Sequence, residues 1–422
     1  MNLDVMLGDL EELVSCESFS ADHEAVARSA RVVADQGLRR LGARPETIVI
    51  DGVTHLRWTF GTPRVLLVGH HDTVWPIGTL ADHPWSLADG IARGPGVFDM
   101  KAGLVQAFHA LAALPSPEGV CLLVTGDEEV GSPSSRALIE ESARGCAAAF
   151  VLEASADGGA LKTARKGTSI YELVVHGRAA HAGLEPTMGA NAGIELAHQI
   201  LALGAIALSA DDGAAPDGLG PTTVTPTVLS GGTTTNTVPA LARVSVDVRV
   251  PTLAAQARVD EMVRALAPRT PGTRLEVSGG PNRPPLEQAS SARLFELACR
   301  IAKDLGMEPP RGVAVGGASD GNFTAGIGCP TLDGLGAVGG GAHAAHEHVV
   351  VAEMPGRTRL LTGLIASVLG GESPAGEAAT EATATGATAT GATAAGATAA
   401  GRTSPAAGGS ASTGEPPGEA GR

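Results

Sequence analysis

Three short apolar runs of this sequence end in residues that could bind a metal ion. These are RVLLVG (64–69) followed by His70, VCLLVT (120–125) followed by Glu128 and Glu129, and AAAFVL (147–152) followed by Glu153. Imidazole and carboxylate groups are ligands that zinc and similar divalent cations accept. If the runs are neighbouring parallel strands, these side chains meet at one edge of a sheet, where open α/β sheets bind their ligands.

Two further candidate ligands lie elsewhere in the chain. Asp99 opens a predicted helix after the turn RGPG (93–96), and His343 follows a glycine-rich stretch (334–341). A carboxylate can bridge two metal ions about 3.5–4 Å apart, the spacing used by two-metal hydrolases. The residue types therefore indicate a pair of divalent cations that activates water for hydrolysis.

Glu128 and Glu129 are adjacent, so they can point to different sides of the chain. One can bind metal while the other acts as the base that deprotonates water, and the residue types alone leave open which does which. Asp72 lies two residues after His70, on the same side of an extended chain, where its carboxylate can accept the second imidazole N–H. We expect Asp72 to orient His70 and not to bind metal.

Helices are expected between and around the apolar runs. The segments with helical spacing of apolar residues are 3–15, 22–41, 99–114, 134–144, 290–305 and 353–369. Buried strands that alternate with helices are typical of a sheet covered by helices on both faces. We therefore expect an α/β fold for this part of the chain.

The pattern changes between residues 167 and 280. The segments 169–176, 223–229 and 243–250 alternate polar and apolar residues, and helical patterns follow at 190–203 and 253–266. Such alternation is typical of an antiparallel sheet with one exposed face. We expect a main domain in two parts, 1–166 and 281–370, with an α+β domain inserted at 167–280. Residues 371–422 are rich in Ala, Gly and Thr and are expected to be a disordered tail.

Composition excludes several classes of function. The 422 residues carry a net charge of −15 and contain no Lys/Arg-rich block, which argues against nucleic-acid binding. The five cysteines include no CxxC pair, so a thiolate metal site is not expected and a reducing cytoplasm fits best. The N-terminus lacks the basic segment followed by an apolar segment that is typical of a secretory signal. The longest near-apolar run, 200–210, is about half the length needed to cross a membrane.

Six segments together resemble those of a known family. The family comprises the co-catalytic zinc exopeptidases and deacylases that include carboxypeptidase G (glutamate carboxypeptidase), acetylornithine deacetylase, succinyl-diaminopimelate desuccinylase and aminoacylase. The matching segments are GHHDTVW (69–75), ARGPGVFDMKAG (92–103), TGDEEVGS (125–132), LEAS (152–155), GRAAHAG (177–183) and GGGAHAAHEHVVV (339–351). The resemblance implies a discontinuous catalytic domain, built on a mixed sheet with helices on both faces, and an inserted α+β lid and dimerisation domain.

The resemblance also implies a role for each candidate residue and a cofactor of two Zn²⁺ ions, with Co²⁺ or Mn²⁺ as substitutes. Asp99 would bridge the two ions. The other implied roles are one zinc site with His70 and Glu153, a second with Glu129 and His343, Glu128 as general base, and Asp72 as the residue that orients His70.

In this family the inserted domain pairs two subunits. The resemblance implies that His181, in GRAAHAG, reaches the active site of the neighbouring subunit and stabilises the tetrahedral oxyanion. Asn236 and Arg249 resemble the lid residues that bind the substrate carboxylate and nearby polar groups. An arginine fork suits a carboxylate, although an arginine on an alternating strand is commonly only solvated.

The resemblance therefore implies a homodimeric dizinc hydrolase of small peptide or N-acyl amino acid substrates, and the cysteine pattern favours the cytoplasm. The segments GPGVFDMKAG and DTVWPIGTL are most similar to the glutamate carboxypeptidase branch, which implies release of a C-terminal amino acid such as glutamate. The nearest alternative is an N-acyl-amino-acid deacylase, such as acetylornithine deacetylase or succinyl-diaminopimelate desuccinylase. A non-catalytic binding protein of the same fold is a second alternative. A serine or cysteine hydrolase, which would be insensitive to a chelator, is a third.

Overall fold

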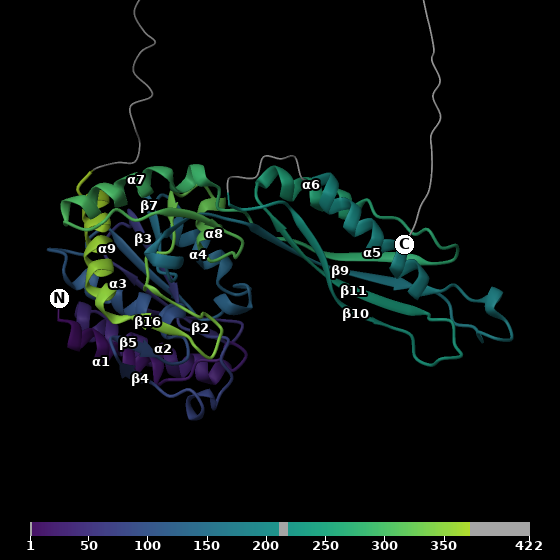
Figure 1. Cartoon of the computed structure of the whole chain (residues 1–422), viewed down its shortest axis with the longest axis horizontal. Helices are drawn as coiled ribbons and strands as arrows, with labels where there is room; N and C mark the ends of the chain where they lie inside the picture. The colour runs from purple at the N-terminus through teal and green to yellow at the C-terminus, as the bar shows by residue number, and fades with distance from the viewer. Residues whose placement is uncertain (1, 211–217, 372–422) are drawn as a thin grey trace, which may run out of the picture. The chain divides into compact units, whose positions relative to one another are not determined.

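The computed structural model describes residues 2–210 and 218–371 (Figure 1). A six-stranded sheet has the order β1-β2-β6-β3-β7-β14. Its strands β3, β6, β7 and β14 are parallel, whereas β1 pairs with β2 and β2 with β6 in antiparallel fashion. The bounds are β1 (Glu46–Ile50), β2 (Val53–Thr59), β3 (Val65–His70), β6 (Val120–Thr125), β7 (Ala148–Val151) and β14 (Thr331–Leu332). The expected tail falls outside the described residues from 372 onward.

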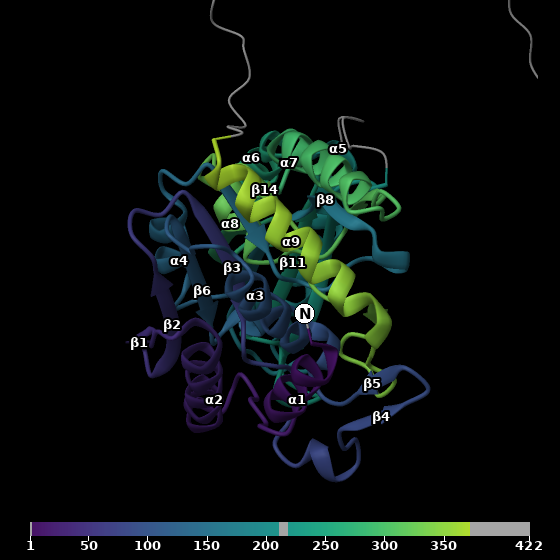
Figure 2. The same ribbon diagram turned by 90° about the vertical axis from the view of Figure 1, so that its left-hand side faces the viewer.

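Helices cover both faces of this mixed sheet. Alternate residues of β3 enter different cores: Val65 and Leu67 pack with the cluster beneath α1, α3, α7 and α9, and Leu66 and Val68 with the cluster beneath α4 and α8. Figure 2 shows α3 and α9 on the first of these faces. The expected α/β class is therefore confirmed. The helices are α1 (Leu3–Val14), α2 (His23–Leu41), α3 (Ala102–Ala112), α4 (Arg136–Ala143), α7 (Gln288–Asp304), α8 (Gly321–Gly326) and α9 (Met354–Leu369).

A second, four-stranded sheet is antiparallel, with the order β10-β11-β9-β12. Two helices cover one face of this sheet (Figure 1). The side chains on that face are alternate residues, such as Tyr171, Leu173 and Val175, and they are buried. The elements are β9 (Gly167–His176), α5 (Ala192–Ala210), β10 (Thr223–Gly231), β11 (Leu241–Val250), α6 (Leu253–Arg264) and β12 (Arg274–Arg283). The sequence did not predict β12, whose residues GGPNR are poor strand formers. The expected domain limits 167 and 280 remain a prediction.

Helix α5 is longer than the apolar run expected at 200–210. It has 19 residues and is long and apolar enough, by length and composition alone, to cross a membrane. The helix nevertheless packs on the second sheet through Leu196, Leu203 and Ile206, and the carboxylate of Glu195 accepts hydrogen bonds from the backbone of Thr270 and Arg269. The core helix of a soluble protein can be equally long and apolar, so the length and composition of α5 are weak evidence for a membrane span.

Several short strands were also missed, because two to five residues show no readable period. They are β4 (Ser86–Ala88), β5 (Ile91–Arg93), β8 (Leu161–Arg165), β13 (Gly312–Val315), β15 (Gly339–Gly340) and β16 (His348–Val350). Helical turns lie at Thr79–Ala81, Val97–Lys101, Glu128–Val130, Asp157–Gly159, Pro186–Met188 and Val351–Glu353. The pairing of β16 with β5 brings the segment that carries His343 beside the turn that carries Asp99.

Candidate metal centre

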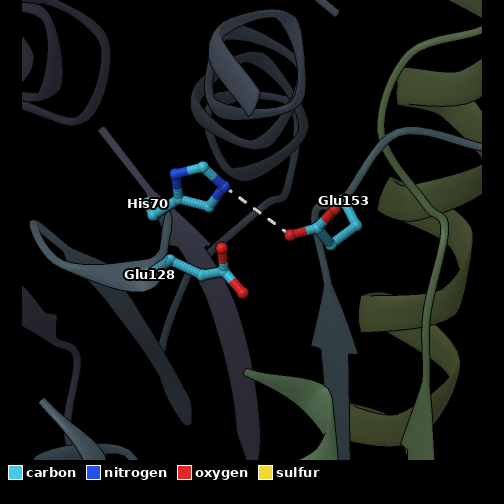
Figure 3. Close-up of side chains that lie close together, drawn as sticks. All are labelled: His70, Glu128 and Glu153. Atoms are coloured by element: carbon cyan, nitrogen blue, oxygen red, sulfur yellow. Dashed lines mark ion pairs between the residues drawn. The ribbon is translucent and has the colours of Figure 1, made fainter. Parts of the chain in front are cut away.

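Three of the expected site residues project from the carboxyl ends of parallel strands. His70 is the last residue of β3, Glu128 opens the turn after β6, and Glu153 follows β7. Their side chains point toward one another (Figure 3), and one ligand atom of each lies within 4.8 Å of the others. A second group with the same spacing consists of His70, Asp99 and Glu129.

Asp99 lies between the two histidines. Its Oδ1 is 3.5 Å from Nε2 of His70, and its Oδ2 is 3.2 Å from Nε2 of His343. Around it, Oε1 of Glu153 is 3.6 Å from Nε2 of His70, and Oε2 of Glu129 is 3.1 Å from Nε2 of His343. The ion-pair distances thus divide the expected ligands into two pairs, His70 with Glu153 and His343 with Glu129. The carboxylate of Asp99 contacts the histidine of each pair.

Two atoms of this cluster are buried without a hydrogen-bond partner in the structure: Nε2 of His70 and Oδ1 of Asp99. A buried polar atom without a partner is costly, and such atoms normally bind something. A divalent cation held by both His70 and Asp99 would satisfy both atoms. The donor set of imidazole and carboxylate groups fits zinc, and it also suits cobalt or manganese.

The ionisation of the cluster follows from its burial and its opposite charges. Hydrogen bonds that the imidazole donates to the carboxylates of Asp99 and Glu129 raise the pKa of His343 to about 10. Burial would raise the pKa of Asp99, but its close contacts with His343 and His70 outweigh burial and lower that pKa. Burial raises the pKa of Glu128 well above that of an ordinary glutamate, although the Arg283 guanidinium opposes the shift. Glu128 is therefore placed to hold a proton as well as to accept one.

Asp72 connects the end of β3 to the turn after β6. Its carboxylate accepts hydrogen bonds from the backbone N–H groups of Glu128 and Glu129, both at 3.2 Å, and from Ser20 Oγ at 2.7 Å. The closest partner of Nδ1 of His70 is the backbone oxygen of Asp72 at 3.0 Å, whereas the carboxylate is at 3.4 Å. Asp72 thus fixes the ring of His70 mainly through its backbone, and the sequence reasoning had expected the carboxylate.

Two buried arginines border the cluster and were not foreseen. Nη2 of Arg283 lies 3.0 Å from Oε1 of Glu128 and 3.0 Å from Oδ1 of Asp320. Nη2 of Arg165 lies 3.8 Å from Oε2 of Glu153, and its guanidinium binds both carboxylate oxygens of Asp333. Neither arginine could be predicted from the sequence, because a single arginine forms no pattern.

Glu347 holds the turn that presents Asp99. Its carboxylate accepts hydrogen bonds from the backbone N–H groups of Gly96, Phe98 and Asp99, at 2.9–3.0 Å, and from Nε1 of Trp75 at 2.9 Å. The side chain is buried, and among the described residues it has no hydrogen bond or ion pair with a ligand side chain. Glu347 therefore supports a ligand through the backbone, a role that sequence reasoning did not assign.

We expect Glu347→Gln to weaken metal binding by about 10–100-fold, the usual cost of disturbing a group that orients a ligand. The amide replaces one acceptor oxygen with a donor, which faces backbone donors and loosens the turn around Asp99. Calorimetric titration of the metal-depleted protein with zinc measures the change. Glu308→Gln, on an exposed residue, is the matched control, and equal affinities for the two variants would contradict this role.

The structure does not bring the three expected residues of the inserted segment to the cluster. None of His181, Asn236 and Arg249 has a described contact with the ligand residues. Nδ1 of His181 accepts hydrogen bonds from the backbone N–H groups of Gly183 and Leu184, so Nε2 carries the proton of the neutral ring, and the residue is exposed.

Asn236 lies beside the His181 segment, since its backbone oxygen accepts a hydrogen bond from Ala182 at 2.8 Å. The guanidinium of Arg249 is occupied by Asp247, with Nε–Oδ1 at 2.9 Å. The geometry of this single chain therefore leaves the roles of His181, Asn236 and Arg249 as predictions.

Comparison with known proteins gives a consistent picture. The model of peptidase family M20/M25/M40 matches residues 66–367. Carboxypeptidase G2 of Pseudomonas sp. (strain RS-16) is 28% identical over 383 residues, which cover 86% of this chain and 89% of that protein. A succinyl-diaminopimelate desuccinylase of Granulibacter bethesdensis is 28% identical over 337 residues, covering 74% of this chain and 84% of its own length.

Solved structures share the fold. An M20 family metallo-carboxypeptidase, Sso-CP2 of Sulfolobus solfataricus, matches with a TM-score of 0.67 at 18% identity and covers 85% of this chain and 98% of its own. Aminopeptidase PepT of Bacillus cereus matches with a TM-score of 0.65 at 22% identity and covers 87% of this chain and 99% of its own.

Proposed function

Because the chain belongs to peptidase family M20/M25/M40 and is a metallohydrolase of that family, we propose that it is a dizinc exopeptidase of the carboxypeptidase type. It removes a C-terminal amino acid, with glutamate as the first candidate, from N-acyl or peptidyl substrates. The observation that carries the proposal is that Asp99 lies between two groups of ligands with the Glu128 carboxylate beside them. The similarity to carboxypeptidase G2 over most of both chains supports the substrate class.

In the proposed mechanism, His70 and Glu153 would hold one ion, Glu129 and His343 would hold the other, and Asp99 would contribute to both sites. Bound there, the two cations would lower the pKa of water and polarise the scissile carbonyl. Glu128 takes the proton from the attacking water and then delivers it to the leaving nitrogen. Burial of Glu128, which raises its pKa, supports the second of these steps.

The inserted domain completes the proposed site. The proton on Nε2 of His181 of the partner subunit would donate a hydrogen bond to the oxyanion. Asn236 and Arg249 would bind the carboxylate and nearby polar groups of the substrate, for which Arg249 must share or leave its ion pair with Asp247. The protein would act in the cytoplasm, which agrees with its five unpaired cysteines.

Homodimer formation through the inserted domain is part of the proposal. Helix α5 exposes Ile194, Leu201 and Leu208, seven residues apart and so on one side of the helix, at 53%, 73% and 83%. Apolar side chains exposed in a row favour contact with another protein surface. Strand β10, at the edge of the second sheet, adds two more exposed apolar side chains. These are Val228 and Leu229, exposed at 66% and 55%.

We expect Leu201→Glu to convert the dimer into a monomer and to lower kcat, because His181 would no longer reach a neighbouring site. Light scattering coupled to size-exclusion chromatography measures the mass. Leu87→Glu replaces an exposed leucine of β4 and is the control. A wild-type protein that is monomeric and fully active would contradict the dimeric site.

A second candidate is an N-acyl-amino-acid deacylase, which the similarity to the desuccinylase supports. A panel of substrates on zinc-loaded protein separates the two, with acyl-glutamates and folate-type compounds against acetylornithine and succinyl-diaminopimelate. We expect glutamate release, abolished by a chelator and restored by zinc. Hydrolysis of the second pair alone would favour the deacylase, and no hydrolysis together with no metal uptake would favour a binding protein.

A further inference from the structure

Arg283 is the last residue of β12, and its side chain extends from the second sheet to the candidate metal centre. Nη2 lies 3.0 Å from Oε1 of Glu128 and 3.3 Å from its backbone oxygen. Among the described residues, no other side chain has a hydrogen bond to the Glu128 carboxylate. Arg283 is 8% exposed, so solvent screens this contact little.

The guanidinium of Arg283 is fixed from several directions. Nη2 also lies 2.6 Å from Ser132 Oγ and 3.0 Å from Oδ1 of Asp320. Its plane lies over the ring of Phe323, with 5.2 Å from Cζ to the ring centre. Asp320 is in turn held by Thr125 Oγ1, at the end of β6.

The backbone of Arg283 is anchored on the other side. Its carbonyl oxygen accepts a hydrogen bond from Nε2 of Gln256, a buried residue of α6, at 2.9 Å. The same amide nitrogen donates to the backbone oxygen of Thr168 on β9, the strand next to β12. One residue thus joins the base of the second sheet to Glu128.

From these contacts we infer that Arg283 is a positioning residue for Glu128. It holds Oε1 and leaves Oε2 free for the attacking water, so the carboxylate meets the water in one orientation. Because the guanidinium is carried by β12, a displacement of the second sheet at its base moves the group that orients Glu128. This inference rests on the proposed role of Glu128 and extends it to the last residue of β12.

Arg283→Met removes the guanidinium and keeps much of the side-chain volume, and Arg283→Lys keeps the charge without the fork. We expect Arg283→Met to lower kcat by about 10²-fold, the lower end of what an aligned proton transfer contributes, with KM and metal content unchanged. Arg283→Lys should retain an intermediate kcat. Guanidinium added to the buffer should restore part of the activity of Arg283→Met and none of the activity of Glu128→Gln.

Arg136→Met is the matched control. Cζ of Arg136 also lies over the ring of Phe323, at 5.3 Å, and its Nη1 donates to the backbone oxygen of Asn282, but it has no described contact with Glu128. We expect this variant to keep wild-type kcat. Equal losses in Arg136→Met and Arg283→Met, without rescue by guanidinium, would show that Arg283 only supports local packing and would overturn the inference.

Crystal structures of the metal-depleted variants give a readout that does not depend on activity. We expect the Glu128 carboxylate to leave its position in Arg283→Met and to keep it in Arg136→Met. An unmoved Glu128 in Arg283→Met would overturn the inference. The proposed function is tested separately. It fails if the wild-type protein hydrolyses no substrate of the panel.

Discussion

Glu128→Gln is expected to lower kcat by about 10³–10⁴-fold while both metal ions stay bound, since aligned proton transfer contributes up to about that factor. The amide keeps the shape of the side chain and can neither take a proton from water nor deliver one to the leaving nitrogen. Steady-state kinetics together with the metal content of the same sample measures the effect.

Two other variants make this result specific to Glu128. Glu129→Gln should lose metal together with activity, because its carboxylate belongs to the group around His343. Glu141→Gln changes an exposed carboxylate of α4 and should alter neither property. Retention of most activity in Glu128→Gln would show that another group handles the proton.

Asp99→Ala is expected to remove both metal ions and to lower activity by at least about 10³-fold, because each ion contributes several kcal/mol to the transition state. Asp99 contacts both groups of ligands, with its two oxygens directed to different histidines. His343→Ala, by contrast, should remove only the ion of the outer group. Elemental analysis of the purified proteins measures the number of ions per chain.

The comparison of these two variants separates a shared ligand from an ordinary one. If Asp99→Ala and His343→Ala each lose one ion, Asp99 belongs to a single site and the bridging role is wrong. Thermal unfolding with and without zinc provides a control for folding, because bound metal stabilises only the folded chain. A variant that has lost its sites should show no stabilisation by zinc.

The strands that carry the site could be predicted from the sequence because they are buried on both faces. A parallel strand in this environment is a continuous apolar run, such as that of β6 at Val120–Thr125, and its end is therefore visible. The residues that follow these runs, among them His70 and Glu153, do lie together in the structure. The proposal that Glu128, and not Glu129, is the base came from the family resemblance and from no pattern in the residues.

The supporting residues could not be predicted, because their contacts join distant segments. Arg283 and Glu128 are 155 positions apart, and Arg165 and Asp333 are 168 apart. Such contacts depend on how the second sheet and the last segments return to the first sheet, which local periodicity does not encode. The strands β5 and β16, whose pairing sets Asp99 near His343, were missed because three residues show no readable period.

The central claim is that five side chains from distant segments bind two cations at one edge of the first sheet. Anomalous diffraction from crystals of zinc-loaded protein, recorded at the zinc absorption edge, tests it most directly. We predict two peaks about 3.5–4 Å apart on either side of the Asp99 carboxylate. A single peak, or zinc bound away from His70 and His343, would contradict the claim.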